Sequence, residues 1–222
     1  ADMPELERYV LHLLARLDAD LRQAAENYEF NRYIRALTDF ANDDLSAFFF
    51  DIRKDSLYCD APGDVKRRAY RTVLDTLFHA LVRYAAPILA FTAEEVWQSR
   101  YPSDEGSIHF EEWPTIDAGW TDEALGDKWT ALRLLRSQVT EAIEPYRRDK
   151  IIRSSLEAEV TVPGAHDGID LEELFIVSKV GAADAITVER TAREKCGRCW
   201  RHMPEVKTDG ELCDRCAEVV NV

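Results

Sequence analysis

The chain has 222 residues, enough for one or two domains with a sizeable apolar core. Its formal net charge of −14 argues against simple nucleic-acid binding, for which a basic balance is expected. No apolar run is long enough to span a membrane, since the best candidate, ALVRYAAPILAF, is short and contains Arg83 and Pro87. The first residues, ADMPELERYV, do not form a signal peptide. We therefore expect a cytoplasmic protein that does not associate with membranes.

The first two thirds of the chain predict long amphipathic helices. Apolar residues recur every three or four positions in four segments: Leu6 to Leu21, Ile34 to Ile52, Tyr70 to Tyr84, and Leu125 to Tyr146. Antiparallel packing of such helices gives a bundle, which we assign to residues 1–153.

The boundaries of these helices follow from turn and capping residues. Pro62 and Gly63 end the second helix, and Pro87 ends or kinks the third. Thr92 and Glu95 form a predicted capping box for a short helix, TAEEVWQSR. The segment 101–120 is rich in Gly, Pro and Ser and is expected to be irregular.

The pattern changes after Ser155. Apolar and polar residues alternate from Leu156 to Val162, which predicts a half-buried strand. IDLEELFIVSKV predicts a helix, and Ala185 to Val188 predict a second strand. We assign residues 154–190 to a small α/β connector and residues 191–222 to a third, cysteine-rich domain. The expected fold class is thus mainly α, a helical bundle followed by this connector and a zinc ribbon.

Four cysteines near the end of the chain form two C-x-x-C pairs, Cys196 with Cys199 and Cys213 with Cys216. Two such turns can supply the four thiolates of a closed tetrahedral zinc site, and the spacer between them has room for a two-stranded hairpin. The sequence therefore predicts one structural zinc ion. The alternatives are two redox dithiols or disulfides, or His202 in place of one cysteine. Cys59 is left without a partner, which favours a reducing compartment and a half-buried thiol.

Basic residues gather in three places despite the acidic total. One cluster runs from Arg190 to Arg201, a second from Arg147 to Arg153, and a third from Lys66 to Arg71. Such patches can guide a polyanion to one face of an acidic protein. The alternative is that each cluster is a solvated helix face. We assign no catalytic residue, because the chain contains neither a phosphate-binding glycine loop nor a nucleophile motif.

Five segments, in order, resemble the C-terminal part of bacterial isoleucyl-tRNA synthetases. They are FFFDIRKDSLY, YAAPILAFTAEEVW, SIHFEEWP, SSLEAEVTV, and EKCGRCW with the following LCDRC. Arg53 and Ser56 depart from the family pattern, which has an apolar residue and often an arginine there. The signatures of the ATP-activating core are missing, so we expect a fragment without the catalytic and editing domains.

The resemblance implies a helical anticodon-binding domain followed by a connector and the ribbon. Its partners would be the anticodon stem-loop of isoleucine tRNA and the catalytic and editing domains of the parent ligase, in which alone ATP is used. We expect a monomer. The expected RNA-binding residues lie around the first C-x-x-C pair: Trp200, Arg198, Arg201, Arg193 and Lys195.

Trp200 follows a predicted zinc ligand directly, so its backbone would be fixed by the metal site. A rigid indole beside Arg198 and Arg201 could stack on an unpaired base. Alternatively, the indole packs the ribbon against the connector or the bundle.

Two other classes of function fit part of the sequence. One is an interaction module in which bundle and ribbon dock on a catalytic body. The other is a glycosylase-type DNA-binding ribbon, which would share the zinc motif but require an N-terminal catalytic module that the helical pattern does not resemble.

Overall fold

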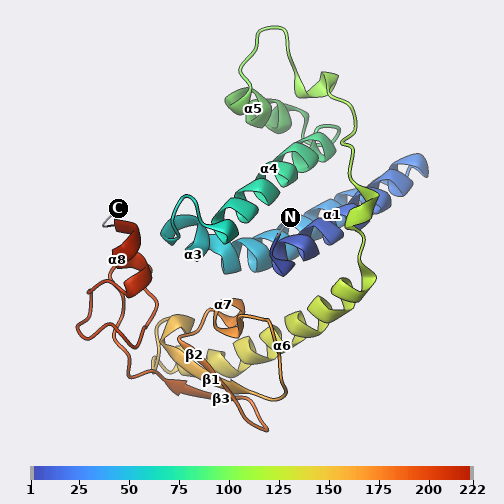
Figure 1. Cartoon of the computed structure of the whole chain (residues 1–222). Coiled ribbons are helices and arrows are strands. Elements are labelled where there is room, and N and C mark those ends of the chain that lie inside the picture. The colour runs from blue at the N-terminus through green and yellow to red at the C-terminus, as the bar shows by residue number, and fades with distance from the viewer. Residues whose placement is uncertain (1–2, 221–222) are drawn as a thin grey trace. The chain divides into compact units, whose positions relative to one another are not determined.

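The structure, a computed structural model, describes residues 3–220. It is mainly helical, with one small sheet (Figure 1), which has three strands. Together with a cluster of four cysteines near the end, this confirms the predicted fold class. The chain divides into two compact units, residues 1–51 with 63–126 and residues 52–62 with 127–222. The domain boundaries at 153/154 and 190/191 stay a prediction, and residues 1, 2, 221 and 222 of the outer two domains lie outside the described residues. None of the described helices is long and apolar enough to cross a membrane.

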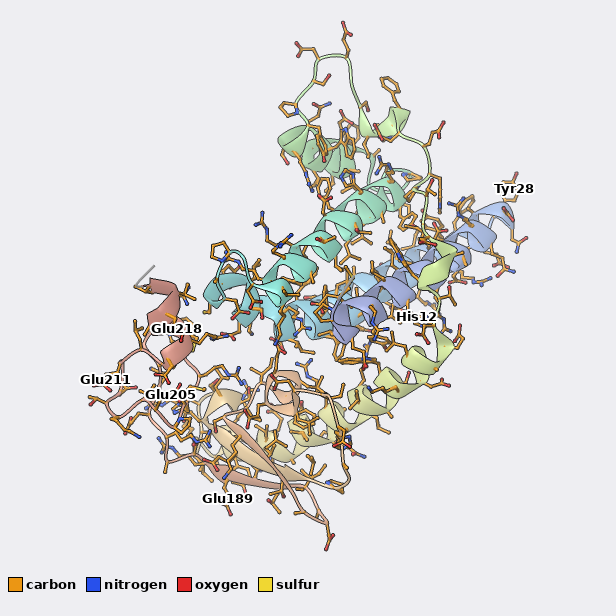
Figure 2. The ribbon with its side chains drawn as sticks, in the orientation of Figure 1. His12, Tyr28, Glu189, Glu205, Glu211 and Glu218 are labelled. Atoms are coloured by element: carbon orange, nitrogen blue, oxygen red, sulfur yellow. The ribbon has the colours of Figure 1, made fainter. Side chains whose placement is uncertain are left out.

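The first unit is built on a helical hairpin. Helix α1 (Glu5–Glu26) packs against α2 (Phe30–Asp39) across a short turn, in which Tyr28 adopts a left-handed φ of 59°. The buried face of α1 contains Leu6, Val10, Leu17 and Leu21 of the predicted stripe, whereas Leu14 is buried in place of the predicted Leu13, which is only partly buried. Tyr28 lies at the far end of α1, and 79% of its surface is exposed (Figure 2).

The helix predicted after Asn31 is continuous but not uniform. Helix α2 passes into a π-helical stretch, η1 (Phe40–Phe50), and then into α3 (Asp51–Cys59). A π-helix has more residues per turn than an α-helix, so the apolar stripe read at α-helical spacing shifts around the axis. Phe48 of the predicted stripe is buried and Phe49, which lay outside the stripe, is buried as well, whereas Ile34 at the start of the stripe is 43% exposed.

Two further helices complete the first unit. Helix α4 (Val65–Ala85) is capped at its N-terminus by Asp64, whose carboxylate accepts hydrogen bonds from the backbone amides of Lys66 and Arg67. It ends before Pro87, as predicted. Helix α5 (Ala90–Arg100) starts two residues before Thr92, with no side-chain cap, so the predicted capping box is wrong. The backbone amide of Ala93 bonds to the carbonyl of Leu89, which already continues the helix through Thr92.

A buried carboxylate ties the irregular segment to this unit. Asp18 on α1 accepts hydrogen bonds from the Tyr84 hydroxyl at 2.6 Å and the Trp113 indole at 2.7 Å. The Arg22 guanidinium adds a third bond at 2.8 Å. The segment around Trp113 contains two short 3-10 turns, η2 (Ile108–Phe110) and η3 (Ala118–Trp120). Its position therefore depends on side-chain contacts with α1 and α4.

The second unit contains the sheet. Helix α6 (Glu123–Arg148) leads through the 3-10 turn η4 (Ser155–Glu157) into β1 (Ala158–Val162). Strand β1 is central, parallel to β2 (Lys179–Ala182) and antiparallel to β3 (Thr187–Arg190). The buried residues of β1, Ala158, Val160 and Val162, match the predicted alternation.

The helix predicted over IDLEELFIVSKV is wrong in its second half. Helix α7 covers only Leu171–Phe175, and Ile176 ends it in a left-handed conformation with φ 57°. The following residues form β2, whose backbone pairs with β1. A short apolar run fits a strand or a helix equally well, and pairing with a distant strand decides between them.

Arg53, the departure from the family pattern, is buried in the second unit. Its guanidinium pairs with the Glu173 carboxylate of α7 at 2.8 Å, and the two side chains are only 5% and 12% exposed. The ion pair accounts for a charged residue at an otherwise apolar position.

Candidate functional site

Four cysteines converge in the C-terminal module, which we define as residues 191–220. Cys196 and Cys199 lie in a tight turn, and Cys213 and Cys216 lie at the start of α8 (Asp214–Val220). Their four sulfurs all lie within 4.8 Å of one another, and the Cys199 and Cys213 sulfurs are 3.8 Å apart. Zn–S bonds of about 2.3 Å in a tetrahedron place sulfurs about 3.8 Å apart. The cluster thus has the donor set and spacing of a closed zinc site.

Backbone contacts hold the first turn in place. The backbone amide of Cys196 donates to the Arg201 carbonyl at 2.9 Å, and the backbone amide of Trp200 donates to the Cys196 carbonyl at 3.0 Å. Gly197 lies so close to the segment around Gly210 that a Cβ at position 197 would be 2.3 Å from the Gly210 carbonyl oxygen. Only glycine fits this crossing. The spacer between the two pairs, which had room for a two-stranded hairpin, forms no strand pair within the described residues, and a single bridge between Lys195 and His202 flanks the first pair instead. A backbone hydrogen bond from Gly197 to the Glu211 carbonyl at 3.0 Å joins the first turn to the end of the spacer.

The pKa values of the thiols differ within the cluster. Burial raises the pKa of Cys196, but the backbone amides of Cys213, Cys199 and Arg198 outweigh it and lower the value to about 6. Burial raises the pKa of Cys199 well above its usual range, and the neighbouring Cys213 and Cys216 raise it further. Burial also raises the pKa of Cys213 to about 11. Four buried thiolates repel one another, and a divalent cation among them would remove that cost.

Two arginines connect the cluster to the end of α3 within the same unit. Each one directly precedes the second cysteine of its pair, in C-G-R-C and C-D-R-C. Arg198 donates to the backbone carbonyl of Cys59 at 2.6 Å and to that of Tyr58 at 3.2 Å. A cation at these carbonyls is favourable because they form the negative end of the helix. We call this pair of contacts the arginine clamp, of which Arg198 is the first half.

Arg215 forms the second half of the arginine clamp. Its two terminal nitrogens bind the Asp55 carboxylate at 2.7 and 3.0 Å, and one of them also binds Asp60 at 2.9 Å. Burial lowers the pKa of Arg215, but the Asp55 carboxylate and the Cys199 sulfur outweigh it and raise the pKa far above its ordinary value. Sequence reasoning missed Arg215, Asp55 and Asp60. The repeated Arg-Cys dipeptide was the available signal, but nothing in the sequence indicated its partners.

The residues predicted to bind RNA have different surroundings. The Arg198 guanidinium is occupied by the arginine clamp and also lies 3.5 Å from the Cys216 sulfur. The Arg193 guanidinium donates to the Ser178 carbonyl at 2.9 Å. Within residues 3–220, the side chains of Lys195 and Arg201 form no hydrogen bond or ion pair.

Trp200 stands out among these residues. It is 64% exposed and has a left-handed φ of 64°, beside the metal-ligand position Cys199. An indole that packed the ribbon against the connector would be covered, so its exposure favours a free stacking surface.

The other candidate ligands lie apart from this cluster. His202 donates from Nδ1 to the Arg193 carbonyl at 2.6 Å, and the metal-binding group found among the described residues contains the four cysteines alone. Cys59 is buried, 7% exposed, rather than half-buried as predicted, and burial raises its pKa to about 11. The carboxylates Glu205, Glu211 and Glu218 belong to the same module (Figure 2). The module is therefore not uniformly basic.

Two family models match the chain. Residues 7–162 match the anticodon-binding domain of tRNA ligase, and residues 193–219 match the zinc finger found in FPG and IleRS. The second match contains all four cysteines of the cluster.

Curated relatives match along almost the whole chain. Isoleucine–tRNA ligase of Zymomonas mobilis is 58% identical over 99% of the chain, and that of Gluconobacter oxydans is 44% identical over 100%. The isoleucine–tRNA ligase of Agrobacterium fabrum is 44% identical over 96%. The chain spans about a quarter of the length of these relatives, 25%, 25% and 24% respectively.

Proposed function

Because this chain belongs to the anticodon-binding domain family of tRNA ligases, we propose that it binds the anticodon stem-loop of isoleucine tRNA. Aminoacylation, with ATP as co-substrate, would be carried out by the part of the ligase that the relatives have beyond the matched quarter. The specificity for isoleucine tRNA rests on the names of the relatives. The expectation that the protein is a monomer stays a prediction.

We also propose that Cys196, Cys199, Cys213 and Cys216 hold one zinc ion with a structural role. The support is the mutual distance of the four sulfurs, within 4.8 Å, and the match to a zinc-finger family. Four thiolate ligands leave no coordination position for water or substrate. The ion would neutralise the buried thiolates and fix the turn that carries Trp200. Lys195 and Arg201, whose side chains are free, would contact phosphates nearby.

The observation that carries the RNA-binding proposal is the exposed indole of Trp200 on a rigid turn. Proteins recognise unpaired bases of RNA loops by stacking them on aromatic rings. A stacked base contributes about 1–3 kcal/mol. The Trp200 side chain needs no rearrangement to offer its face, so little of that free energy is lost in ordering the protein.

The test is Trp200→Ala, assayed for binding to the isoleucine anticodon stem-loop and, in the full-length ligase, for charging and for ATP–pyrophosphate exchange. We expect binding and charging to fall about ten- to a hundred-fold, because about 1.4 kcal/mol is a factor of ten. Exchange should be unchanged, since amino-acid activation needs no tRNA contact here. Trp200→Phe is the matched variant and should retain most of the binding.

Zinc content and thermal stability of the same preparations separate the two interpretations of Trp200. Normal RNA binding by Trp200→Ala would refute the stacking role. Loss of binding together with loss of zinc would show that the indole stabilises the module instead.

A further inference from the structure

A second basic surface lies at the end of α6, in a segment that the proposed function does not use. A hollow of about 610 Å³ is lined there by Arg147, Arg148, Lys150 and Arg153, with Glu144 and Ile152. All four cations are exposed. Arg147 pairs with Glu144, and Arg148 lies 3.4 Å from Asp149. Lys150 and Arg153 form no hydrogen bond or ion pair through their side chains within residues 3–220. We call these four cations and their hollow the basic hollow.

The backbone beneath the basic hollow is well fixed. The backbone amide of Lys150 donates to the Arg147 carbonyl at 3.1 Å, and that of Ile151 donates to the Tyr146 carbonyl at 2.9 Å. These two bonds form a Schellman motif, which closes the C-terminus of α6. Ile152 is 1% exposed and anchors the loop in the interior. The cations are thus attached to a rigid loop.

Lys150 occupies the position of this motif that strongly favours glycine. Its φ is 59°, in the left-handed region, where a side chain is disfavoured. A glycine would form the same turn with less strain. The sequence therefore carries a cation here at some cost in stability, which is typical of a residue kept for binding.

We propose that the basic hollow binds backbone phosphates of the tRNA whose anticodon stem-loop the chain recognises, an inference that rests on the proposed function. Arginine forks match the oxygen geometry of a phosphate, and three arginines line the hollow. The chain has a net charge of −14, so a polyanion is attracted to its few basic surfaces, of which the basic hollow is one. Phosphate contacts of this kind fix the orientation of a nucleic acid without reading its sequence.

The proposal predicts opposite effects of one substitution on stability and binding. Lys150→Gly removes the charge and relieves the strained φ, so Tm should rise by about 2–4 °C. RNA affinity should nevertheless fall. A purely structural role for Lys150 predicts no loss of affinity in a more stable protein.

Salt dependence gives the decisive measurement. Binding of the 222-residue chain to the isoleucine anticodon stem-loop is titrated between about 50 and 300 mM KCl for wild type, Lys150→Gly, Arg153→Gln and the double variant. Each lost phosphate contact should reduce the slope of log K against log salt by about one, so the double variant should lose about two. The matched control is Arg16→Gln with Arg35→Gln, which removes two exposed cations of α1 and α2 that lie outside the three basic clusters and should leave the slope unchanged.

The outcomes separate this proposal from the proposed function. An unchanged slope in the double variant, or an equal loss in the control, overturns the basic hollow while leaving anticodon recognition intact. No binding by the wild-type chain overturns the proposed function and the phosphate site with it, whereas equal binding of an unrelated stem-loop overturns the specificity for isoleucine tRNA alone. Reduced affinity with an unchanged slope would also overturn the phosphate contacts, because the substitutions would then act on the fold of the chain and not through their charge.

Discussion

The two Arg-Cys dipeptides of the C-terminal module place a ligand and a structural cation in adjacent positions. Cys199 and Cys216 lie in the four-cysteine cluster, and the arginine that directly precedes each of them, Arg198 or Arg215, binds residues at the end of α3. Metal ligation and docking of the module therefore depend on the same two turns. Arg198, expected from the sequence to contact RNA, has its guanidinium committed to this docking, and its role in RNA binding stays a prediction.

Replacement of Arg215 should weaken the arginine clamp. Arg215→Ala leaves Asp55 and Asp60 without their partner, and hydrogen bonds to charged groups contribute about 1.5–3 kcal/mol each. The side chain of Arg215 is 33% exposed, so we expect a loss of unfolding free energy near the lower end of that range. Denaturant unfolding measures it. Arg215→Lys should recover only part of the loss, because an ammonium cannot reproduce the bidentate contact with Asp55.

Arg201→Ala is the control for that measurement, because the Arg201 side chain forms no hydrogen bond or ion pair within residues 3–220 yet carries the same charge. Its unfolding free energy should match that of the wild type. Equal destabilisation by both substitutions would mean that the arginine clamp contributes nothing specific.

The spacing of the cysteines predicted that the four side chains converge, because all four lie within a short stretch of sequence. The partners of Arg215 could not be predicted, since Asp55 and Asp60 lie 160 and 155 residues away. Similarly, Arg53 stood out as an odd residue in the sequence, but its partner Glu173 emerged only with the fold. Contacts set by tertiary structure leave no local pattern.

At the scale of elements, Asp18 links α1, α4 and the irregular segment of the first unit. Burial raises the pKa of Tyr84 far above its usual value, and its hydrogen bond to Asp18 raises it further. The Trp113 indole gives the irregular segment a fixed point on the same carboxylate. One buried acceptor thus orders a loop that has little secondary structure.

Asp18→Ala should destabilise the first unit by about 2–4 kcal/mol. The substitution leaves the Tyr84 hydroxyl and the Trp113 indole without an acceptor, and each buried donor left unpaired costs about 1–3 kcal/mol. Thermal unfolding and the near-ultraviolet signal of the aromatic residues report the change. Asp20→Ala, which breaks the exposed pair with Arg32, should cost much less, because exposed ion pairs are screened by solvent and contribute little to stability. Comparable losses in the two variants would show that Asp18 is not a structural centre.

The helices were predicted more successfully than the strands. Helix α6 follows its apolar spacing over 26 residues, which is long enough for the pattern to be unambiguous. Strand β2 has only four residues, and it exists because β1 supplies its hydrogen-bonding partners. The start of α5 was misplaced because backbone bonds, rather than the Thr92 side chain, determine it.

For the whole molecule, the fold class and the order of the parts could be predicted from the sequence. The two compact units could not, because each unit joins segments that are not consecutive in the sequence. Residues 52–62 belong to the second unit, which otherwise begins after Gly126. The arginine clamp and the Arg53–Glu173 pair both join this segment to later residues. Loss of metal from the four-cysteine site should therefore change the stability of the end of α3, which lies far away in the sequence.

Removal of the metal tests this coupling. Structural zinc contributes about 10–16 kcal/mol of apparent binding free energy in small modules, so chelation should unfold residues from about Arg193 onward. The arginine clamp would be released, and amides near Tyr58 and Cys59 should lose protection from hydrogen exchange as well. Amides of α1 and α4 should keep their protection, and added zinc should restore the protection of the amides that lost it.

Cys199→Ser should reproduce the chelated state, whereas Cys59→Ser, at the one cysteine outside the cluster, should retain zinc. Protection that persists in metal-free protein would show that the module folds without zinc, and loss of protection in α1 would show that its effect is not confined to the second unit.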